Sequence, residues 1–325
     1  MANHNFKRSL ILALAGIVIV IGVVSTTDIK SVAGVLTRAD WRFLPLAVGA
    51  QLLAYLCLTR KLKAIADKYK VISYSAAFRI WLTGALIDLA TPFIQVGGEP
   101  LKIFMLKRKG MKISKASAVV AADTFVELFA FFAMLVVAML LLILSSKSPA
   151  AVFTYLLGVV MAALLISLAF FIILNKSLLQ KCVLKVERLA RHFGYHIKDY
   201  SRIVSSFEST FRSLLNKEAL MLETFSLSII AKALDFARIY FVFLVIGYPI
   251  GIDTVVLVWA ILVVLSMLPG LPGNLGVIEA GGIAAYVLFG VPAHIAAAVI
   301  IIDRLISFWM LVGIGAAAFW KGLKK

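Results

Sequence analysis

The chain has 325 residues, of which 62% are hydrophobic and only 15% are charged, and its mean hydropathy is +1.03. Soluble domains contain about 25% charged residues, and they need that polar surface to cover an apolar core. The composition therefore excludes a cytosolic enzyme, a disordered chain and a secreted disulfide scaffold, and it predicts a protein of the lipid bilayer. The net charge of +17 indicates contact with anionic lipid of the inner leaflet. No nucleic-acid partner is expected, because no basic module stands apart from the apolar segments.

Uninterrupted apolar runs, each long enough for a helix to cross a bilayer, occupy residues 10–26, 43–59, 116–144, 150–174, 219–247 and 293–319. Two further apolar regions, 71–106 and 254–290, are interrupted by Pro and Gly. The first run follows Lys7 and Arg8 without a convincing small-residue cleavage site, so it is interpreted as a retained span rather than a signal peptide. We expect an all-α polytopic membrane protein in which residues 1–325 form a single membrane domain.

The distribution of Lys and Arg predicts the topology of these spans. If the N-terminus is cytoplasmic, 25 of the 33 basic residues fall on the inner side and four on the outer side, as the positive-inside rule requires. We therefore expect a multi-pass protein of the cell (inner) membrane with both termini in the cytoplasm. The same count requires regions 71–106 and 254–290 each to enter and leave on one side. The polar stretch 175–217 is interpreted either as a cytoplasmic amphipathic helix on the membrane surface or as a solvated linker helix.

An internal repeat relates the two halves of the chain, about 10–144 and 150–320. A shift of 180 residues gives eight identities in 32 aligned positions, which include Pro92 with Pro272, Glu99 with Glu279, Gly110 with Gly290 and Asp123 with Asp303. The predicted topology gives the halves opposite orientations, an inverted repeat of the kind found in many secondary transporters. Residues 280–290, after the second break, are too few to cross a bilayer. The prediction is thus about six full transmembrane helices plus two re-entrant helical hairpins, while the charge pattern alone leaves full crossings open.

Ionisable residues inside apolar spans are presumed functional, because each costs roughly 2.5–3.5 kcal/mol on insertion scales. Asp123 and Glu127 are four residues apart and share a helix face, which predicts either a site for a proton or cationic headgroup, or a salt-bridge cluster between helices. Lys232, Asp235 and Arg238 allow local neutralisation or, if one base is released, phosphate recognition.

Glu99 and Glu279 follow glycines at the two breaks, where a carboxylate either lines a cavity or caps a half-helix N-terminus. We predict that the breaks face a polar cavity, because non-helical backbone at this depth is tolerated only inside protein or beside water. The substrate-binding candidates are Gly97, Gly98, Glu99, Asp123, Glu127, Lys232, Asp235, Arg238, Gly273, Asn274, Gly276, Glu279, Asp303 and Arg304. Neither the histidines nor Cys57 and Cys182 have metal-ligand spacing, and no catalytic set appears, so no metal, cofactor or enzymatic activity is predicted.

The glycine–glutamate pattern resembles the flippase-like membrane domain of lysylphosphatidylglycerol synthases, which also occurs as stand-alone proteins. The motifs that carry the resemblance are Pro92…Gly97-Gly98-Glu99, Gly110, Ala116…Asp123, Pro269-Gly270…Gly273…Gly276…Glu279 and Asp303-Arg304. Two departures stand out: Thr124 follows Asp123 where relatives often carry Arg, and no basic residue precedes Gly97. Because the chain ends at Lys325, we expect no soluble aminoacyl-transferase domain.

The resemblance implies movement of a phospholipid or a polyprenyl-linked lipid between leaflets, with the headgroup crossing through the charged midplane cavity. Half-helix N-termini near the glycines are expected to hold phosphate oxygens. The alternatives are a small-solute or ion secondary transporter, an intramembrane lipid-modifying enzyme, and a partner of a synthase. The sequence leaves a homo-oligomer open.

Overall fold

The computed structural model describes residues 29–91, 97–144, 200–266 and 272–323, and within these ranges the chain is helical and contains no strand. The predicted spans 10–26 and 150–174 lie outside the described residues, as do most of the 175–217 segment and the residues at the two breaks, 92–96 and 267–271.

The described helices follow the predicted apolar segments closely. The first half contributes α2 (Ile29–Thr37), η1 (Trp41–Phe43), α3 (Leu44–Ala66), α4 (Tyr74–Ala90), α5 (Gly98–Arg108) and α6 (Ile113–Leu144). The second half contributes α9 (Tyr200–Leu215), α10 (Glu218–Ile246), α11 (Ile252–Ser266), η2 (Pro272–Asn274), α12 (Val277–Leu288), α13 (Ala293–Arg304), the π-helical turn η3 (Leu305–Trp309) and α14 (Met310–Leu323). Each interrupted region is therefore a pair of helices separated by a break.

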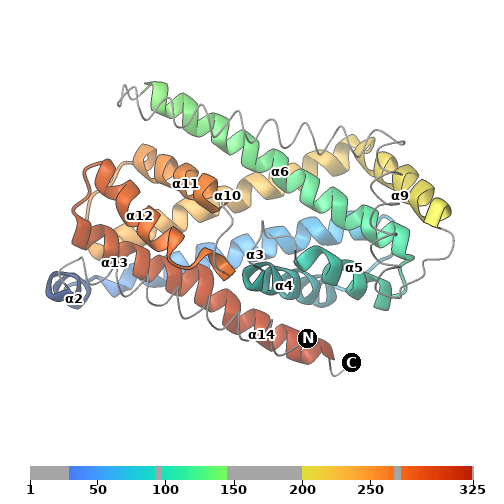
Figure 1. Cartoon of the computed structure of the whole chain (residues 1–325), viewed down its shortest axis with the longest axis horizontal. Coiled ribbons are helices and arrows are strands. Elements are labelled where there is room, and N and C mark those ends of the chain that lie inside the picture. The colour runs from blue at the N-terminus through green and yellow to red at the C-terminus, as the bar shows by residue number, and fades with distance from the viewer. Residues whose placement is uncertain (1–28, 92–96, 145–199, 267–271, 324–325) are drawn as a thin grey trace, which may run out of the picture.

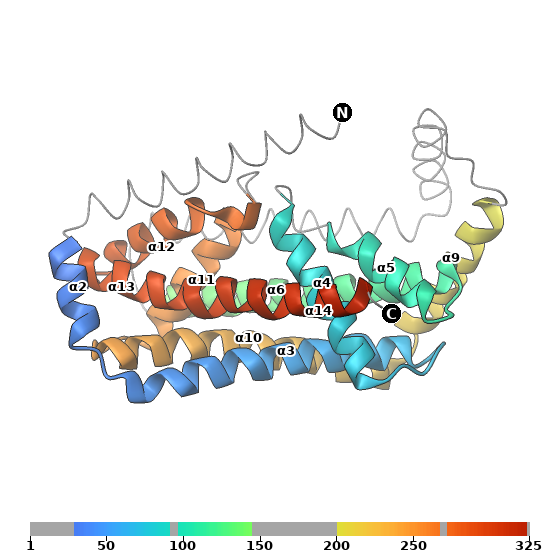
Figure 2. The same cartoon turned by 90° about the horizontal axis from the view of Figure 1, so that it is seen from below.

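Within the described chain, three segments are long and apolar enough to cross a membrane: Trp41–Ala66, Ile113–Leu141 and Ala293–Trp320. Helix α10 is also long, but it carries Lys232, Asp235 and Arg238 in its middle. Figure 2 shows α3 and α10 running alongside each other, and Figure 1 shows α6 and α14 along opposite long edges of the molecule. The shorter pairs α4–α5 and α11–α12 fill the space between these long helices.

The 180-residue repeat recurs in the backbone. Adding 180 to the bounds of α5 gives 278–288, against Val277–Leu288 for α12. Gly110 and Gly290 end these helices with the same positive φ of +88°, a conformation that glycine adopts without steric cost. The residue after each glycine makes the same backbone hydrogen bond to its helix. Met111 N–H donates to Leu106 O at 3.2 Å, and Val291 N–H donates to Tyr286 O at 3.0 Å. One helix–turn–helix backbone is thus built twice from different side chains.

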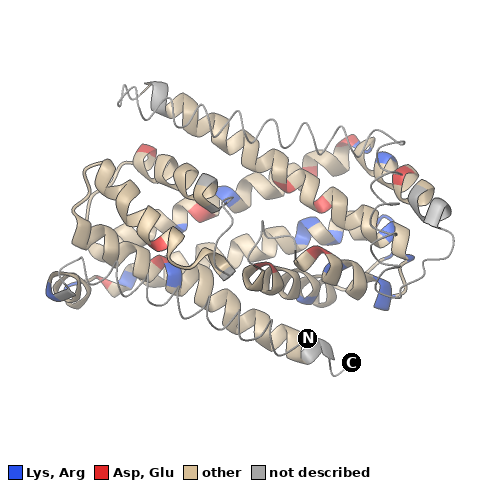
Figure 3. Ribbon diagram, in the orientation of Figure 1, with Lys and Arg blue, Asp and Glu red and all other residues tan. Residues whose placement is uncertain are grey.

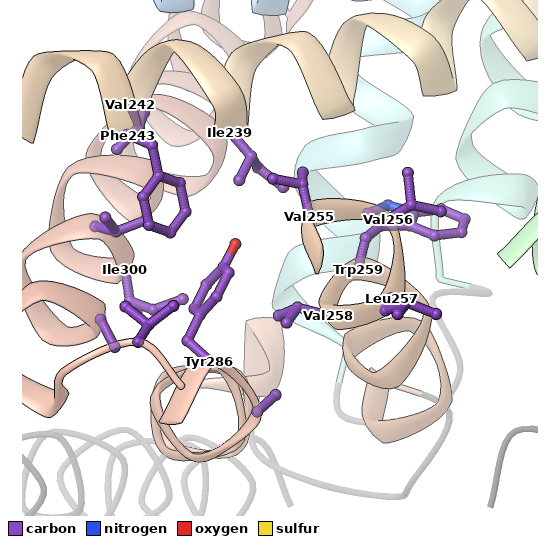
Figure 4. Close-up of a cluster of buried hydrophobic side chains, with 14 of the residues drawn as sticks. Ile239, Val242, Phe243, Val255, Val256, Leu257, Val258, Trp259, Tyr286 and Ile300 are labelled. Atoms are coloured by element: carbon purple, nitrogen blue, oxygen red, sulfur yellow. The ribbon is translucent and has the colours of Figure 1, made fainter. Parts of the chain in front are cut away.

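Apolar side chains gather in two main clusters at opposite ends of the molecule. One is built mostly from α10 to α13, where Tyr286 points toward Phe243 and Ile239 of α10 with ring centroids of Tyr286 and Phe243 5.1 Å apart (Figure 4). The other is built mostly from α3 to α6 with α9 and α14. Each repeat half therefore has most of a core of its own, and the long helices tie the two together.

The described part of the 175–217 segment forms helix α9, which packs on α6. Phe211 and Leu214 are buried, and the Phe211 ring meets Phe125 of α6 edge-on at 5.9 Å between centroids. Phe207 stacks on Phe211 from the same face. The leucines and valines that carried the amphipathic prediction lie outside the described residues. Over α9 the apolar side chains of Phe211 and Leu214 are covered by protein.

Candidate functional site

Charged residues lie along the middle of the long helices as well as at their ends (Figure 3). Buried and half-buried ones, together with the buried Gln51, form two groups. The first, called here the lysine cluster, consists of Lys61, Glu99, Lys102, Asp123, Glu127 and Lys232. The second, the arginine cluster, consists of Gln51, Asp235, Arg238, Glu279, Asp303 and Arg304.

Glu127 is the centre of the lysine cluster. One of its carboxylate oxygens lies 2.7 Å from Lys61 Nζ of α3, and the other lies 2.6 Å from Lys232 Nζ of α10. Ser228, one turn before Lys232, donates to the first oxygen at 3.3 Å, and the Lys232 ammonium also lies 4.1 Å from the centre of the Phe131 ring. Glu127 thereby joins three helices through ion pairs whose lysine side chains are only 2% and 8% exposed.

Asp123 extends the cluster toward α5. Lys61 Nζ lies 3.2 Å from Asp123 Oδ1 and donates to the carbonyl oxygen of the same residue. On the other side, Lys102 Nζ lies 3.9 Å from Asp123 Oδ2 and 3.6 Å from Glu99 Oε1. Thr124 Oγ1 donates to that Glu99 oxygen at 3.2 Å. The three lysines and three carboxylates form one continuous chain of alternating charge.

The arginine cluster holds the equivalent acids of the second half. Arg238 of α10 donates to Asp303 Oδ1 at 2.8 Å, to Asp235 at 3.0 Å and to Gln51 Oε1 of α3. Arg304 Nε donates to Glu279 Oε1 at 2.6 Å. Asp303 and Arg304 are adjacent in the sequence but pair with different helices, Asp303 with α10 and Arg304 with α12.

The glycines at the breaks hold the backbone close to these charges. Arg304 also donates to the Gly273 carbonyl oxygen at 3.2 Å, and Gly273 lies so near the Phe308 ring that a Cβ there would be 2.3 Å from it. Gly273 and Asn274 have positive φ of +67° and +52°. Gly97 and Gly276 are the N-cap residues of α5 and α12.

The backbone donors at these helix starts are already bonded to carboxylates. Gly98 N–H donates to Asp88 Oδ1 at 2.7 Å, and Gly276 N–H donates to Glu279 Oε2 at 2.6 Å. The two donors that the sequence offered for phosphate oxygens therefore have partners. For Glu279 the capping role is observed, while Glu99 instead faces Thr124 and Lys102.

The expected placement of two lysines needs correction. Lys61 and Lys102 were counted among the bases of the cytoplasmic loops, but both are buried within helices. Lys61 lies just past the predicted end of its span because the hydropathy falls there, whereas α3 continues to Ala66. The signal that finds Lys102 is the repeat, since its counterpart at a shift of 180 is Gly282, a buried position on α12.

Asp235 lies between Lys232 and Arg238 in the sequence of α10. It pairs with Arg238, while Lys232 pairs with Glu127.

Comparison with known proteins places the chain among membrane proteins of one family. Residues 10–315 match the family described as the lysylphosphatidylglycerol synthase TM region. A UPF0104 membrane protein of Methanothermobacter thermautotrophicus is 24% identical over 95% of this chain and 92% of its own length. The corresponding protein of Methanocaldococcus jannaschii is 24% identical, with 95% and 93% covered, and that of Pyrococcus horikoshii is 23% identical, with 98% of each covered. Because the match spans nearly the whole sequence, the chain belongs to the family of the lysylphosphatidylglycerol synthase transmembrane region.

Proposed function

We propose that the protein moves a phosphate-bearing or otherwise polar lipid headgroup between the leaflets of the cell membrane. The observation that carries the proposal is the chain of buried ion pairs from Glu99 on α5 to Lys232 on α10. A purely structural role explains it poorly, because a buried ion pair often contributes no more stability than apolar side chains of the same volume. Membrane proteins keep such groups where polar substrates or protons cross.

The two clusters lie close enough to serve one pathway. Lys232 and Arg238 are six positions apart on α10, roughly 9 Å along the helix axis. In the second half, the non-helical Gly273 before α12 places its carbonyl oxygen within hydrogen-bond distance of Arg304. Under the proposal, the acyl chains stay in the bilayer while the headgroup exchanges partners along the ion-pair chain.

The proposal includes the inverted topology of the two halves. The shared turn geometry at Gly110 and Gly290 supports it, as does the equivalent placement of Asp123 and Asp303. In each half, this aspartate is paired with a base from the first long helix: Lys61 in one half and Arg238 in the other. An inverted repeat with breaks at mid-membrane is the arrangement by which transporters expose one site to both sides in turn.

A reconstituted assay tests the function. Vesicles containing acyl-labelled fluorescent phospholipids are treated with an impermeant reductant, so that only lipid reaching the outer leaflet is quenched. We expect the wild-type protein to accelerate quenching of the inner-leaflet probe. Glu127→Gln should slow that exchange about tenfold or more, because Glu127 loses the charge that holds two ammonium groups.

The matched control is Glu223→Gln, which removes a carboxylate of α10 from an exposed pair with Arg60 of α3. It should retain the wild-type exchange rate, because exposed pairs contribute little. The melting temperature of each variant in detergent shows that it is folded at the assay temperature. If no lipid exchanged in these vesicles but a water-soluble ion or solute crossed in a Glu127-dependent way, the protein would be a solute transporter and the proposal would be wrong.

A further inference from the structure

The two halves place corresponding residues around Glu99 and Glu279, but they satisfy these carboxylates to different degrees. At a shift of 180, Thr124 corresponds to Arg304 and Lys102 to Gly282. Both Thr124 and Arg304 donate to the equivalent oxygen, Oε1, of their glutamate. In the first half, then, a neutral hydroxyl stands where the second half has a guanidinium.

Every carboxylate oxygen of the two second-half acids has a partner. Glu279 Oε1 accepts from Arg304 and Oε2 accepts from Gly276 N–H, both at 2.6 Å. Asp303 Oδ1 accepts from Arg238 at 2.8 Å, and Oδ2 accepts from Ser307 Oγ at 3.4 Å. The carboxylates of Glu279 and Asp303 are therefore fully hydrogen-bonded within the protein.

In the first half, hydrogen-bonding groups of Glu99 and of Lys102 are left without hydrogen bonds. Glu99 Oε2 is buried and accepts no hydrogen bond, and Asp123 Oδ1 is compensated by the Lys61 ammonium at 3.2 Å. The side chain of Lys102 is 8% exposed, and its ammonium lies 3.6 Å from Glu99 and 3.9 Å from Asp123, beyond hydrogen-bond distance. Within the described chain, the Glu99 carboxylate thus keeps an acceptor without a hydrogen bond, and the Lys102 ammonium lies beside it without a hydrogen bond to Glu99 or Asp123.

The charges around this place restrict what completes it. Asp88 of α4 adds a third carboxylate beside Glu99 and occupies Gly98 N–H, so a bare anion is disfavoured. A metal cation would satisfy the carboxylates and repel Lys102. The group that fits presents an anionic oxygen to Lys102 and, next to it, an O–H or N–H donor to Glu99 and Asp123. A phosphodiester followed by a hydroxyl or a primary ammonium has this chemistry.

We propose that Lys102, Glu99 and Asp123 form the headgroup-binding site. This site selects phospholipids whose headgroup carries a hydrogen-bond donor beside the phosphate. The equivalent pair of the second half, Glu279 and Arg304, has a structural role. The proposal rests on the lipid-transport function and specifies its substrate class. Phosphatidylethanolamine and phosphatidylglycerol carry such donors, as an ammonium and as hydroxyls respectively. Phosphatidylcholine carries the same phosphate and a cationic nitrogen without an N–H.

Lipid binding is measured first, by the rise in melting temperature of the purified protein in detergent when each of these three lipids is added. The wild type should bind phosphatidylethanolamine or phosphatidylglycerol about tenfold or more tightly than phosphatidylcholine, as expected for a lost hydrogen bond to a charged group. Thr124→Arg gives Glu99 the partner that Glu279 already has. It should abolish the selectivity without lowering the melting temperature of the lipid-free protein.

Ser209→Arg adds the same charge at an exposed position of α9 and should leave the selectivity intact. Lys102→Met should weaken the binding of all three lipids, because each carries the phosphate oxygen that Lys102 would bind. Glu279→Gln, in contrast, should lower the melting temperature and keep the lipid preference. Equal affinity for all three lipids, or undiminished selectivity in Thr124→Arg, overturns the proposal and leaves water as the occupant. Selective binding without any lipid exchange in vesicles would overturn the transport function alone.

Discussion

At the scale of single residues, the lysine cluster depends on Lys61, whose ammonium joins Asp123 to Glu127. Removing one member of a buried ion pair is costly, because the charge left behind has lost its compensation and cannot reach water. The neighbouring residue Arg60 makes an ion pair of similar length, 2.8 Å to Glu223, but the side chains of Arg60 and Glu223 are 49% and 41% exposed. Two adjacent bases of α3 thus differ mainly in burial.

We expect Lys61→Met to destabilise the protein by about 3 kcal/mol, the lower end of the range for breaking a buried pair. Arg60→Met should cost less than about 1 kcal/mol, because exposed pairs are screened by water. Thermal unfolding in detergent, followed by circular dichroism, measures both variants against the wild type. Equal melting temperatures for the two variants would show that Glu127 keeps full compensation from Lys232 alone.

Residue patterns predicted part of this site. The spacing of Asp123 and Glu127 predicted one helix face and a basic partner, and the structure supplies Lys61 and Lys232. The identity of those partners was out of reach, because the contact between Glu127 and Lys61 depends on how α3 packs on α6. The same holds for Gln51, which meets Arg238 from 187 positions away.

At the scale of helices, the start of α5 is packed directly against α4. A Cβ on Gly98 would lie 2.2 Å from the Gly84 carbonyl oxygen, and a Cβ on Gly84 would lie 2.4 Å from Lys102 Cε. Glycine at both positions lets the two helices approach closely enough for Lys102 to lie between them and reach Glu99. The position of Lys102 in the lysine cluster therefore depends on the absence of a side chain at Gly84 and Gly98.

Gly98→Ala should destabilise the protein by about 1–3 kcal/mol, the usual cost of overpacking, because the atom it would strike belongs to the main chain of α4. Gly49→Ala in α3 is the matched control, since nothing lies within 4 Å of a Cβ there. That control should be neutral or stabilising by up to about 1 kcal/mol, from helix propensity. Melting temperatures again report the difference, and a Gly98→Ala variant as stable as Gly49→Ala would mean that α4 and α5 separate freely.

Helix positions were the most predictable feature of the fold. The apolar run 219–247 corresponds to α10 at Glu218–Ile246, and the run 293–319 corresponds to the continuous stretch of α13, η3 and α14. Hydropathy succeeds here because lipid and protein core both favour apolar side chains. It fails at helix ends, where α3 runs on past residue 59 to Ala66 and carries a buried Lys61.

At the scale of the whole molecule, the loops between helices separate into two ends. A Cβ on Gly110 would lie 3.8 Å from Lys70 Nζ, and Tyr69 donates to the Thr210 carbonyl oxygen at 3.1 Å, so these loops share one end. Asp40 N–H donates to the Val245 carbonyl oxygen at 2.7 Å, which joins the loop before α3 to the end of α10. The first of these ends carries most of the exposed Lys and Arg of the described chain.

Cysteine labelling tests whether these ends face opposite sides of the membrane. In a variant lacking Cys57 and Cys182, an impermeant maleimide should label Lys70→Cys and Lys112→Cys only in inside-out vesicles. The reason is that basic loops stay in the cytoplasm, and that the α4–α5 region returns to the side from which it entered. Arg42→Cys should be labelled only in intact cells, and so should Pro292→Cys, which lies 180 positions from Lys112. Labelling of Lys112→Cys and Pro292→Cys from the same side would contradict the opposite orientation of the two halves, because residues at equivalent turns of an inverted repeat must face opposite compartments.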